Sequence, residues 1–154
     1  MAENLPPESI SGYVTGEGCF YAESGYDPKY KLEHRVRLAF CIEVKESDRG
    51  ILEGIRQALG CGNIYSLDFG RYKGYEEKNW QRHVKFRVSN FQDIWTKVIP
   101  FFRKYPLYGM KKKVFEIYSD IAKRMYESKH ITYEGLEQIK VLVSHLKALN
   151  KKGL

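Results

Sequence analysis

Two stretches of the chain alternate apolar and polar residues with the period of two that half-buried β-strands show. In residues 34–45 the apolar positions are Val36, Leu38, Phe40 and Ile42. In residues 80–89 they are Val84, Phe86 and Val88, and between them stand His83, Lys85 and Arg87. Shorter patterns over 19–24 and 63–69 supply a neighbour for each. The sequence therefore predicts two β-hairpins, and the strand over 80–89 has one apolar and one strongly basic face.

Helical spacing of apolar residues and capping signals predict helices around these hairpins. We expect them over 8–16, 49–59, 91–103, 109–128 and 132–149. The predicted N-terminal caps are Ser9 or Glu8, Asp48, Asn90 or Ser89, and Thr132, and Gly60 is expected to end the second helix. This order predicts one α+β domain over 1–154, with one mixed sheet and helices on one of its sides. The core is expected at 8–128, followed by a C-terminal helix at 132–149.

Composition and charge narrow the kind of partner. The 154 residues include 26 Lys and Arg against 19 Asp and Glu, a net charge of +7, together with 12 Tyr, 8 Phe and 2 Trp. Residues 71–125 hold fourteen basic and five acidic residues, so the positive charge is concentrated there. A basic, aromatic-rich domain is typical of a nucleic-acid binder. A ribosomal or membrane-surface protein has the same composition, and exposed lysines also serve solubility.

Several classes of protein are excluded. No apolar run approaches the roughly 20 residues of a membrane span, so we expect no membrane partner. The polar, acidic start of the chain is unlike a signal or transit peptide. Cys19, Cys41 and Cys61 form no CxxC pair, which argues against a zinc ribbon or a disulfide framework. We expect three reduced thiols in an intracellular, reducing compartment, either an organelle or a prokaryotic cytoplasm.

The first predicted helix carries an informative motif, Ile10 to Gly18, with the sequence ISGYVTGEG. Gly12 and Gly16 are four residues apart, so they share a helix face on which a second helix can approach closely. Glu17 follows in the last turn, where the helix dipole disfavours a carboxylate unless a cation is bound. Two such helices packed together would bring two Glu17 side chains to the symmetry axis, a donor set that suits Mg²⁺. An ordinary helix crossing with a surface glutamate has the same pattern.

This motif, followed by Cys19-Phe20, resembles the signature of the LAGLIDADG homing endonucleases. Further segments resemble the family in the same order, over about residues 9 to 120. They are Arg37 to Phe40, Asp48-Arg49 ahead of Ile51-Leu52, Leu59 to Gly62 with Ile64, and Tyr105-Pro-Leu107 followed by Lys111 and Phe115. The resemblance implies an α+β fold of the order αββαββα with a curved, DNA-binding antiparallel sheet.

The resemblance also implies a function: a site-specific double-strand DNA endonuclease that hydrolyses phosphodiesters with a divalent cation, Mg²⁺. Glu17, with the Gly18 carbonyl, would bind the metal, and Lys111 would act at the scissile phosphate. Lys112 and Lys113 remain alternatives for that lysine. Because the chain has one copy of the motif, the family pattern implies a homodimer on a pseudo-palindromic target. Its interface would contain Gly12, Tyr13 and Gly16.

The strands and the second hairpin loop supply the expected DNA contacts. These residues are Tyr21, Glu23, Arg35, Arg37, Tyr65, Arg71, Lys73, Lys85 and Arg87. The chain departs from the family at Thr15, where the family has an acid, and at Val44, a position that is often Gln. Two alternatives stay open: a group I intron maturase that binds intron RNA, and a catalytically inactive sequence-specific DNA-binding protein of the same fold.

Overall fold

The computed structural model describes residues 2–67 and 82–152. The strands are β1 (Gly18–Tyr26), β2 (His34–Lys45), β3 (Asn63–Ser66) and β4 (His83–Val88). The α-helices are α1 (Pro7–Glu17), α2 (Arg49–Leu59), α3 (Phe91–Asp93), α4 (Ile99–Lys104), α5 (Gly109–Tyr126) and α6 (Tyr133–Lys152). Short helices η1 (Glu46–Asp48), η4 (Ile94–Val98) and η5 (Lys129–Ile131) complete the described part. Two of the expected DNA contacts, Arg71 and Lys73, lie outside the described residues.

The four strands form one sheet in the order β1-β2-β4-β3, and every pairing is antiparallel. The expectation of a mixed sheet is therefore wrong, whereas the antiparallel sheet implied by the family resemblance is confirmed. The two hairpins join through their second strands, β2 and β4, and this pair is also antiparallel. This places the two longest alternating patterns of the sequence side by side.

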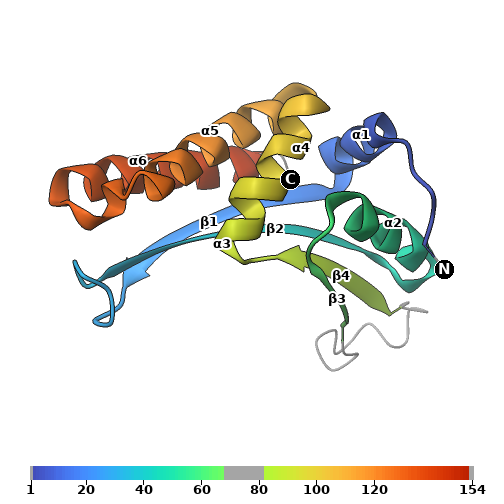
Figure 1. Ribbon diagram of the computed structural model, residues 1–154, viewed down its shortest axis with the longest axis horizontal. Helices are drawn as coiled ribbons and strands as arrows, with labels where there is room; N and C mark the ends of the chain where they lie inside the picture. Colours follow the sequence, from blue (N-terminus) through green and yellow to red (C-terminus); the bar gives the residue numbers. More distant parts are fainter. Residues whose placement is uncertain (1, 68–81, 153–154) are drawn as a thin grey trace.

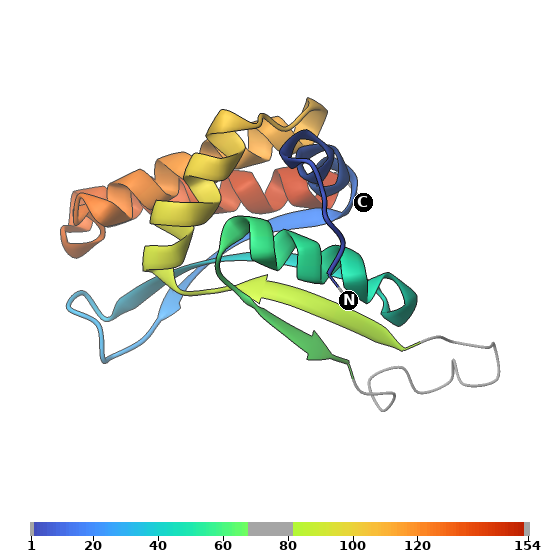
Figure 2. The same ribbon diagram turned by 45° about the vertical axis from the view of Figure 1, so that its right-hand side comes forward.

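The helices cover one face of the sheet in both views (Figure 1, Figure 2), and the other face is open and concave (Figure 1). Phe20, Phe40, Phe86 and Phe102 are almost fully buried between the two layers and pack edge-on or tilted against one another. The apolar stripe of α6 belongs to the same core, with Ile139 and Leu146 fully buried. The open face is consequently formed by the residues that alternate with these buried positions.

The helix ends show which capping signals operate. The Asn90 carboxamide accepts a hydrogen bond from Asp93 N, and Thr132 Oγ1 accepts one from Gly135 N, as predicted. Gly60 ends α2 in the left-handed conformation, with φ 76°. Asp48 stands at the expected N-cap position but makes no side-chain cap bond. The expected Ser9 or Glu8 cap is wrong: Pro6 is the N-cap of α1, and the preset φ of proline starts the helix.

The helical stretch 91–104 is continuous but not regular. Its middle part, η4, is a π-helix that lies directly ahead of Pro100. Since proline has no N–H to donate and its ring crowds the preceding turn, a widened turn at this point accommodates it. Trp95 of η4 stacks on Tyr126 of α5 with ring centroids 4.8 Å apart, which joins this segment to the long helix pair. No helix within residues 2–67 and 82–152 has the length and apolar character needed to traverse a bilayer.

Candidate metal site and nucleic-acid interface

Glu17 and Gly18 form the junction at which α1 turns into β1. The Glu17 side chain is exposed, while Gly18 is buried. A Cβ added at Gly18 would lie 2.6 Å from Val14 Cγ1 and 3.0 Å from the Val14 carbonyl oxygen, so the close turn requires glycine. This turn places a carboxylate and a backbone carbonyl on consecutive residues at one end of the open face.

Lys111 on α5 donates a hydrogen bond from Nζ to the Gly18 carbonyl oxygen. Burial lowers the pKa of Lys111, while Cys19 and Glu17 act in the opposite direction. The next two lysines, Lys112 and Lys113, are exposed, and Lys112 borders a separate hollow between α4 and α5. Of the three candidate lysines, the geometry brings Lys111 to the Glu17–Gly18 junction.

Two hydrogen bonds from α1 hold the start of α5 in place. Thr15 Oγ1 donates to the Ser11 carbonyl at 2.7 Å and accepts from Tyr108 N at 3.3 Å. Ser11, on the buried side of α1, donates a hydrogen bond from its hydroxyl to the Tyr105 carbonyl. Thr15 therefore joins the motif helix to the segment that carries Lys111. In this chain, the residue at the position where the family has an acid is hydrogen-bonded to the segment that leads into α5.

The outer face of α1 is open. A Cβ added at Gly12 or Gly16 would meet no atom within 4 Å, although glycine within a helix costs about 0.5–1 kcal/mol relative to alanine. Figure 1 shows α1 at one end of the helical layer. Tyr13, the third residue expected at an interface, is half-buried against this chain's own core. The packing reason for the two glycines is therefore not found within the described part of this chain.

The open face of the sheet carries the predicted strand residues in aligned rows. Glu23 lies opposite Arg37, and Tyr65 lies opposite Lys85, which is itself opposite Glu43. A hollow of about 830 Å³ runs along this face. It is lined in part by Glu17, Tyr21, Glu23, Arg37, Lys85 and Arg87. The Glu17–Gly18 junction and the strand residues therefore border one continuous surface.

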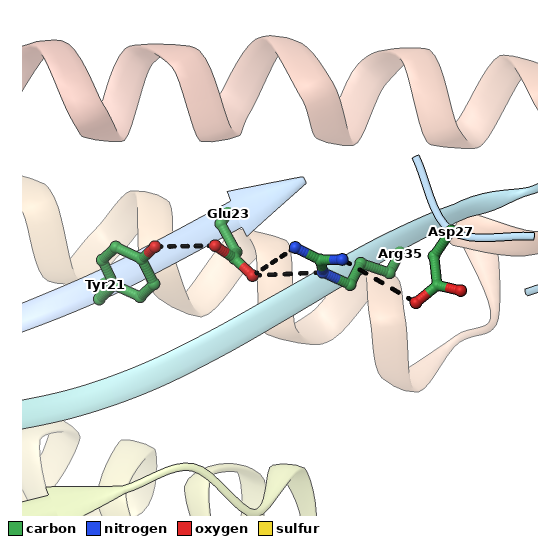
Figure 3. Close-up of polar contacts among 4 residues, drawn as sticks. All are labelled: Tyr21, Glu23, Asp27 and Arg35. Carbon is green, nitrogen blue, oxygen red and sulfur yellow. Dashed lines mark hydrogen bonds and ion pairs between the residues drawn. The ribbon is translucent and has the colours of Figure 1, made fainter. Parts of the chain in front are cut away.

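Acidic partners restrain one of the arginines (Figure 3). Arg35 Nη2 lies 3.2 Å from Glu23 Oε1, and Arg35 Nη1 lies 3.9 Å from Asp27 Oδ2. Tyr21 donates its hydroxyl to Glu23 Oε2 at 2.8 Å. This hydrogen bond, with the Arg35 guanidinium, holds the pKa of Glu23 below its ordinary value. Arg35 is thus held in a network, whereas Arg37 on the same strand is exposed.

The open face is less uniformly basic than the sequence suggested. Glu43 lies on it, and its Oε2 accepts a hydrogen bond from His83 Nδ1 at 3.0 Å. Glu43 was missed as a site residue, although its place in the alternating pattern of 34–45 marks it as facing outward. Val44 is buried and pairs with Val84, so the departure from the family pattern removes no polar group from the open face.

A second residue that the sequence reasoning missed is Asn150, near the end of α6. Its side-chain amide donates to the Phe20 carbonyl at 3.0 Å. It also borders a hollow with Glu17, Gly18, Cys19 and Lys111. A surface-facing asparagine at the end of an amphipathic helix gives no sequence signal of such a contact.

The described residues of one chain offer few donors for a metal ion. Among residues 2–67 and 82–152, no group of three or more His, Cys, Asp or Glu side chains is placed to hold a metal ion. The available donors at the junction are the Glu17 carboxylate and the Gly18 carbonyl oxygen. Both are hard oxygen donors, and the carbonyl already attracts the cationic Lys111. This donor set fits Mg²⁺ as one half of a shared site.

Comparison with known proteins finds a family model, curated relatives and solved structures that all describe endonucleases. The family model described as LAGLIDADG endonuclease matches residues 10–122. A curated relative from Neurospora crassa, "Probable intron-encoded endonuclease 2", is 34% identical over 147 residues. That match covers 95% of this chain and 29% of the relative, so the chain spans less than a third of that protein's length.

Solved structures share the fold. The I-LtrWI LAGLIDADG homing endonuclease bound to target DNA has a TM-score of 0.80 and 30% identity, covering 93% of this chain and 44% of that one. The homing endonuclease I-TnaI has a TM-score of 0.78 and 26% identity, and the match covers 99% of this chain and 100% of I-TnaI. The αββαββα order and the concave antiparallel sheet are therefore those of this group of structures.

Proposed function

Because the chain belongs to the LAGLIDADG endonuclease family, we propose that it forms half of a site-specific endonuclease that cuts both strands of duplex DNA. The observation that carries the proposal is the cluster of Glu17, Gly18 and Lys111 at one end of the concave sheet face. The Glu17 carboxylate and the Gly18 carbonyl could bind a cation there, and the Lys111 ammonium could contact a phosphodiester bound beside it.

Mg²⁺, when bound, would supply an activated water and stabilise the leaving oxygen of the phosphodiester. Glu17 and the Gly18 carbonyl would hold it, because both are oxygen donors on consecutive residues. Lys111 would stabilise negative charge on the phosphate, since its ammonium is already positioned at the same carbonyl. Thr15 would position Lys111 through its hydrogen bond to Tyr108.

A second copy of this fold would complete the site, and we propose that it is a second copy of this chain. The open face of α1 with Gly12 and Gly16 supports this, because it lets two helix backbones approach closely. Tyr13 would flank the crossing with its exposed part. A crossing there would bring two Glu17 carboxylates together. The two concave sheets would then lie along one duplex, and the two-fold symmetry predicts a pseudo-palindromic target.

The concave face would contact the DNA. Arg37, Lys85 and Arg87 would donate to bases or phosphates, and Tyr21 and Tyr65 would contact base edges or sugars. Arg35 and Glu23 would act together, because their ion pair fixes the direction of both side chains. Arg71 and Lys73, which fall outside the described residues, are proposed as further contacts on the basis of charge alone.

A selection among duplexes tests the proposal. Wild type and Glu17→Gln are incubated with Mg²⁺ and a library of pseudo-palindromic duplexes, and cut ends are sequenced. We expect discrete double-strand cuts with short 3′ overhangs from wild type and none from Glu17→Gln. Glu8→Gln is the matched control, since it removes the same charge from the other end of α1. Site-selective binding without cutting would contradict the nuclease proposal, and specific binding of an intron RNA would favour the maturase.

A further inference from the structure

Two of the three thiols form a cross-strand pair on the open face. Cys19 of β1 and Cys41 of β2 are direct register partners, between the pairs Gly18↔Ile42 and Phe20↔Phe40. Because Phe20 and Phe40 point into the core, the strand alternation sends both thiols to the opposite face. Cys19 is exposed and Cys41 is half-buried. Both thiols border the hollow along the concave face.

We propose that Cys19 and Cys41 are an oxidation site that takes a peroxide and closes into a reversible cross-strand disulfide. Directly opposed residues in an antiparallel pair have Cα atoms about 4.5 or 5.5 Å apart. Both separations fall within the range of about 4.4–6.8 Å that disulfides span. The third thiol, Cys61, lies beyond the end of α2 and lines a different hollow, so it has no part in the pair.

The chemistry balances with hydrogen peroxide as the oxidant. The Cys19 sulfur attacks one peroxide oxygen, the O–O bond breaks, and one water leaves as Cys19 becomes a sulfenic acid. The Cys41 sulfur then attacks the Cys19 sulfur, the S–O bond breaks, and the second water leaves as the S–S bond forms. The two thiols lose two electrons and two protons, which the peroxide takes up. Cys19 reacts first because it is exposed, whereas burial raises the pKa of the Cys41 thiol.

The bridge would be easily reduced. The ladder of β1 and β2 runs from Gly18↔Ile42 to Tyr26↔His34, so the strands have little freedom to adjust to ideal disulfide geometry. Strained or exposed disulfides have higher reduction potentials and serve as labile or regulatory bonds. In a reducing compartment the pair is therefore reduced at rest and closes on exposure to the oxidant.

Closure would act on the proposed metal site. Cys19 follows Gly18 directly, and it borders the same hollow as Glu17 and Lys111. Tying Cys19 to β2 would restrict the Gly18 carbonyl and change the floor of the DNA-binding hollow. This consequence rests on the proposed endonuclease function, whereas formation of the bridge does not. We expect oxidation to slow DNA cleavage at least tenfold and reduction to restore it.

Peptide mapping tests the bridge without any DNA. The full chain, Cys19→Ser and Cys61→Ser are treated with hydrogen peroxide, blocked with N-ethylmaleimide, digested and analysed by mass spectrometry. We expect a reducible peptide pair joining Cys19 to Cys41 in wild type and Cys61→Ser, and none in Cys19→Ser. Alkylation of both Cys19 and Cys41 after oxidation, or a linkage of either to Cys61, would overturn the proposal.

Cleavage of a selected duplex tests the consequence. Oxidised wild type is compared with its reduced sample, and Cys19→Ser, which lacks the thiol that reacts first, is treated in the same way against its own untreated sample. We expect loss and recovery of cutting in wild type and no effect of this treatment on Cys19→Ser. Equal cutting by fully bridged and reduced protein would overturn the regulatory consequence. A chain that bridges as mapped but never cuts DNA would refute the endonuclease function instead.

Discussion

Replacing Gly12 by alanine should strengthen the folded chain and weaken its association with a second copy. In this chain the added Cβ meets no atom within 4 Å, so the substitution causes no internal clash. Glycine within a helix is destabilising by about 0.5–1 kcal/mol relative to alanine. For a chain of this size each kcal/mol shifts Tm by about 2–4 °C, so Gly12→Ala should raise Tm by about 1–4 °C.

The effect on association has the opposite sign. An extra methyl group in a close-packed contact costs about 1–3 kcal/mol. Two-fold symmetry places it in the crossing twice, which gives about 2–6 kcal/mol, a weakening of the dimer of tenfold or more. Gly16→Ala should behave in the same direction, because Gly16 lies on the same open face.

Sedimentation velocity over a range of concentrations measures the dissociation constant, and thermal unfolding of dilute protein measures the stability of the single chain. Dilution matters because association itself raises the apparent stability. Gly25→Ala is the matched control: it adds the same atom on β1, where the nearest contact is Arg35 at 3.8 Å. A Gly12→Ala chain that dimerises as tightly as wild type would refute the close crossing of α1 helices.

Four further predictions concern Gly18, Lys111 with its neighbour Lys112 as the control, Tyr21 and Glu23. Gly18→Ala forces a Cβ to 2.6 Å from Val14 Cγ1, so it should lower the free energy of unfolding by about 1–3 kcal/mol in thermal or urea melts. Lys111→Met should slow single-turnover cleavage, measured by quenched flow, about 100-fold or more. It should leave duplex affinity, measured by filter binding, almost unchanged. The control Lys112→Met should change neither the cleavage rate nor the affinity. Tyr21→Phe removes a donor to Glu23 and should alter base preference at one position of a selected site library. The pKa of Glu23 is lower in the folded chain than its ordinary value of about 4.5. The ionised Glu23 carboxylate therefore stabilises the fold above pH 4.5, and this stabilisation is lost as the pH falls through the folded-state pKa. The Tm difference between wild type and Glu23→Gln should shrink on acidification.

Local signals in the sequence predicted much of the fold. Alternation over 34–45 and 80–89 predicted both the strands and the faces that they bury, since a strand with one buried face must alternate. The caps Asn90 and Thr132 and the end of α2 at Gly60 follow from short-range hydrogen bonding and left-handed backbone geometry. The cap of α1 was wrongly assigned to Ser9 or Glu8: the N-cap is Pro6 and the helix begins at Pro7, because a preset proline φ acts without any side-chain hydrogen bond.

Contacts between residues far apart in the sequence could not be predicted in the same way. The hydrogen bonds between Thr15 and Tyr108 and between Asn150 and Phe20 depend on how the helices pack on the sheet, and no local sequence pattern predicts that packing. The ion pairs of Arg35 with Glu23 and Asp27 likewise depend on the strand register and on the turn that follows β1. The family resemblance supplied Glu17 and Lys111, and the structure adds that both lie at Gly18.

Single-turnover cleavage of a selected duplex by wild type, Glu17→Gln and Glu8→Gln, with Mg²⁺ or with chelator, tests the proposed metal site. We expect wild type and Glu8→Gln to cut both strands only with Mg²⁺. We expect Glu17→Gln to bind the same duplex and leave it intact. Cutting by Glu17→Gln at the wild-type rate, or cutting by wild type in chelator, would contradict the assignment of the metal site to Glu17 and Gly18.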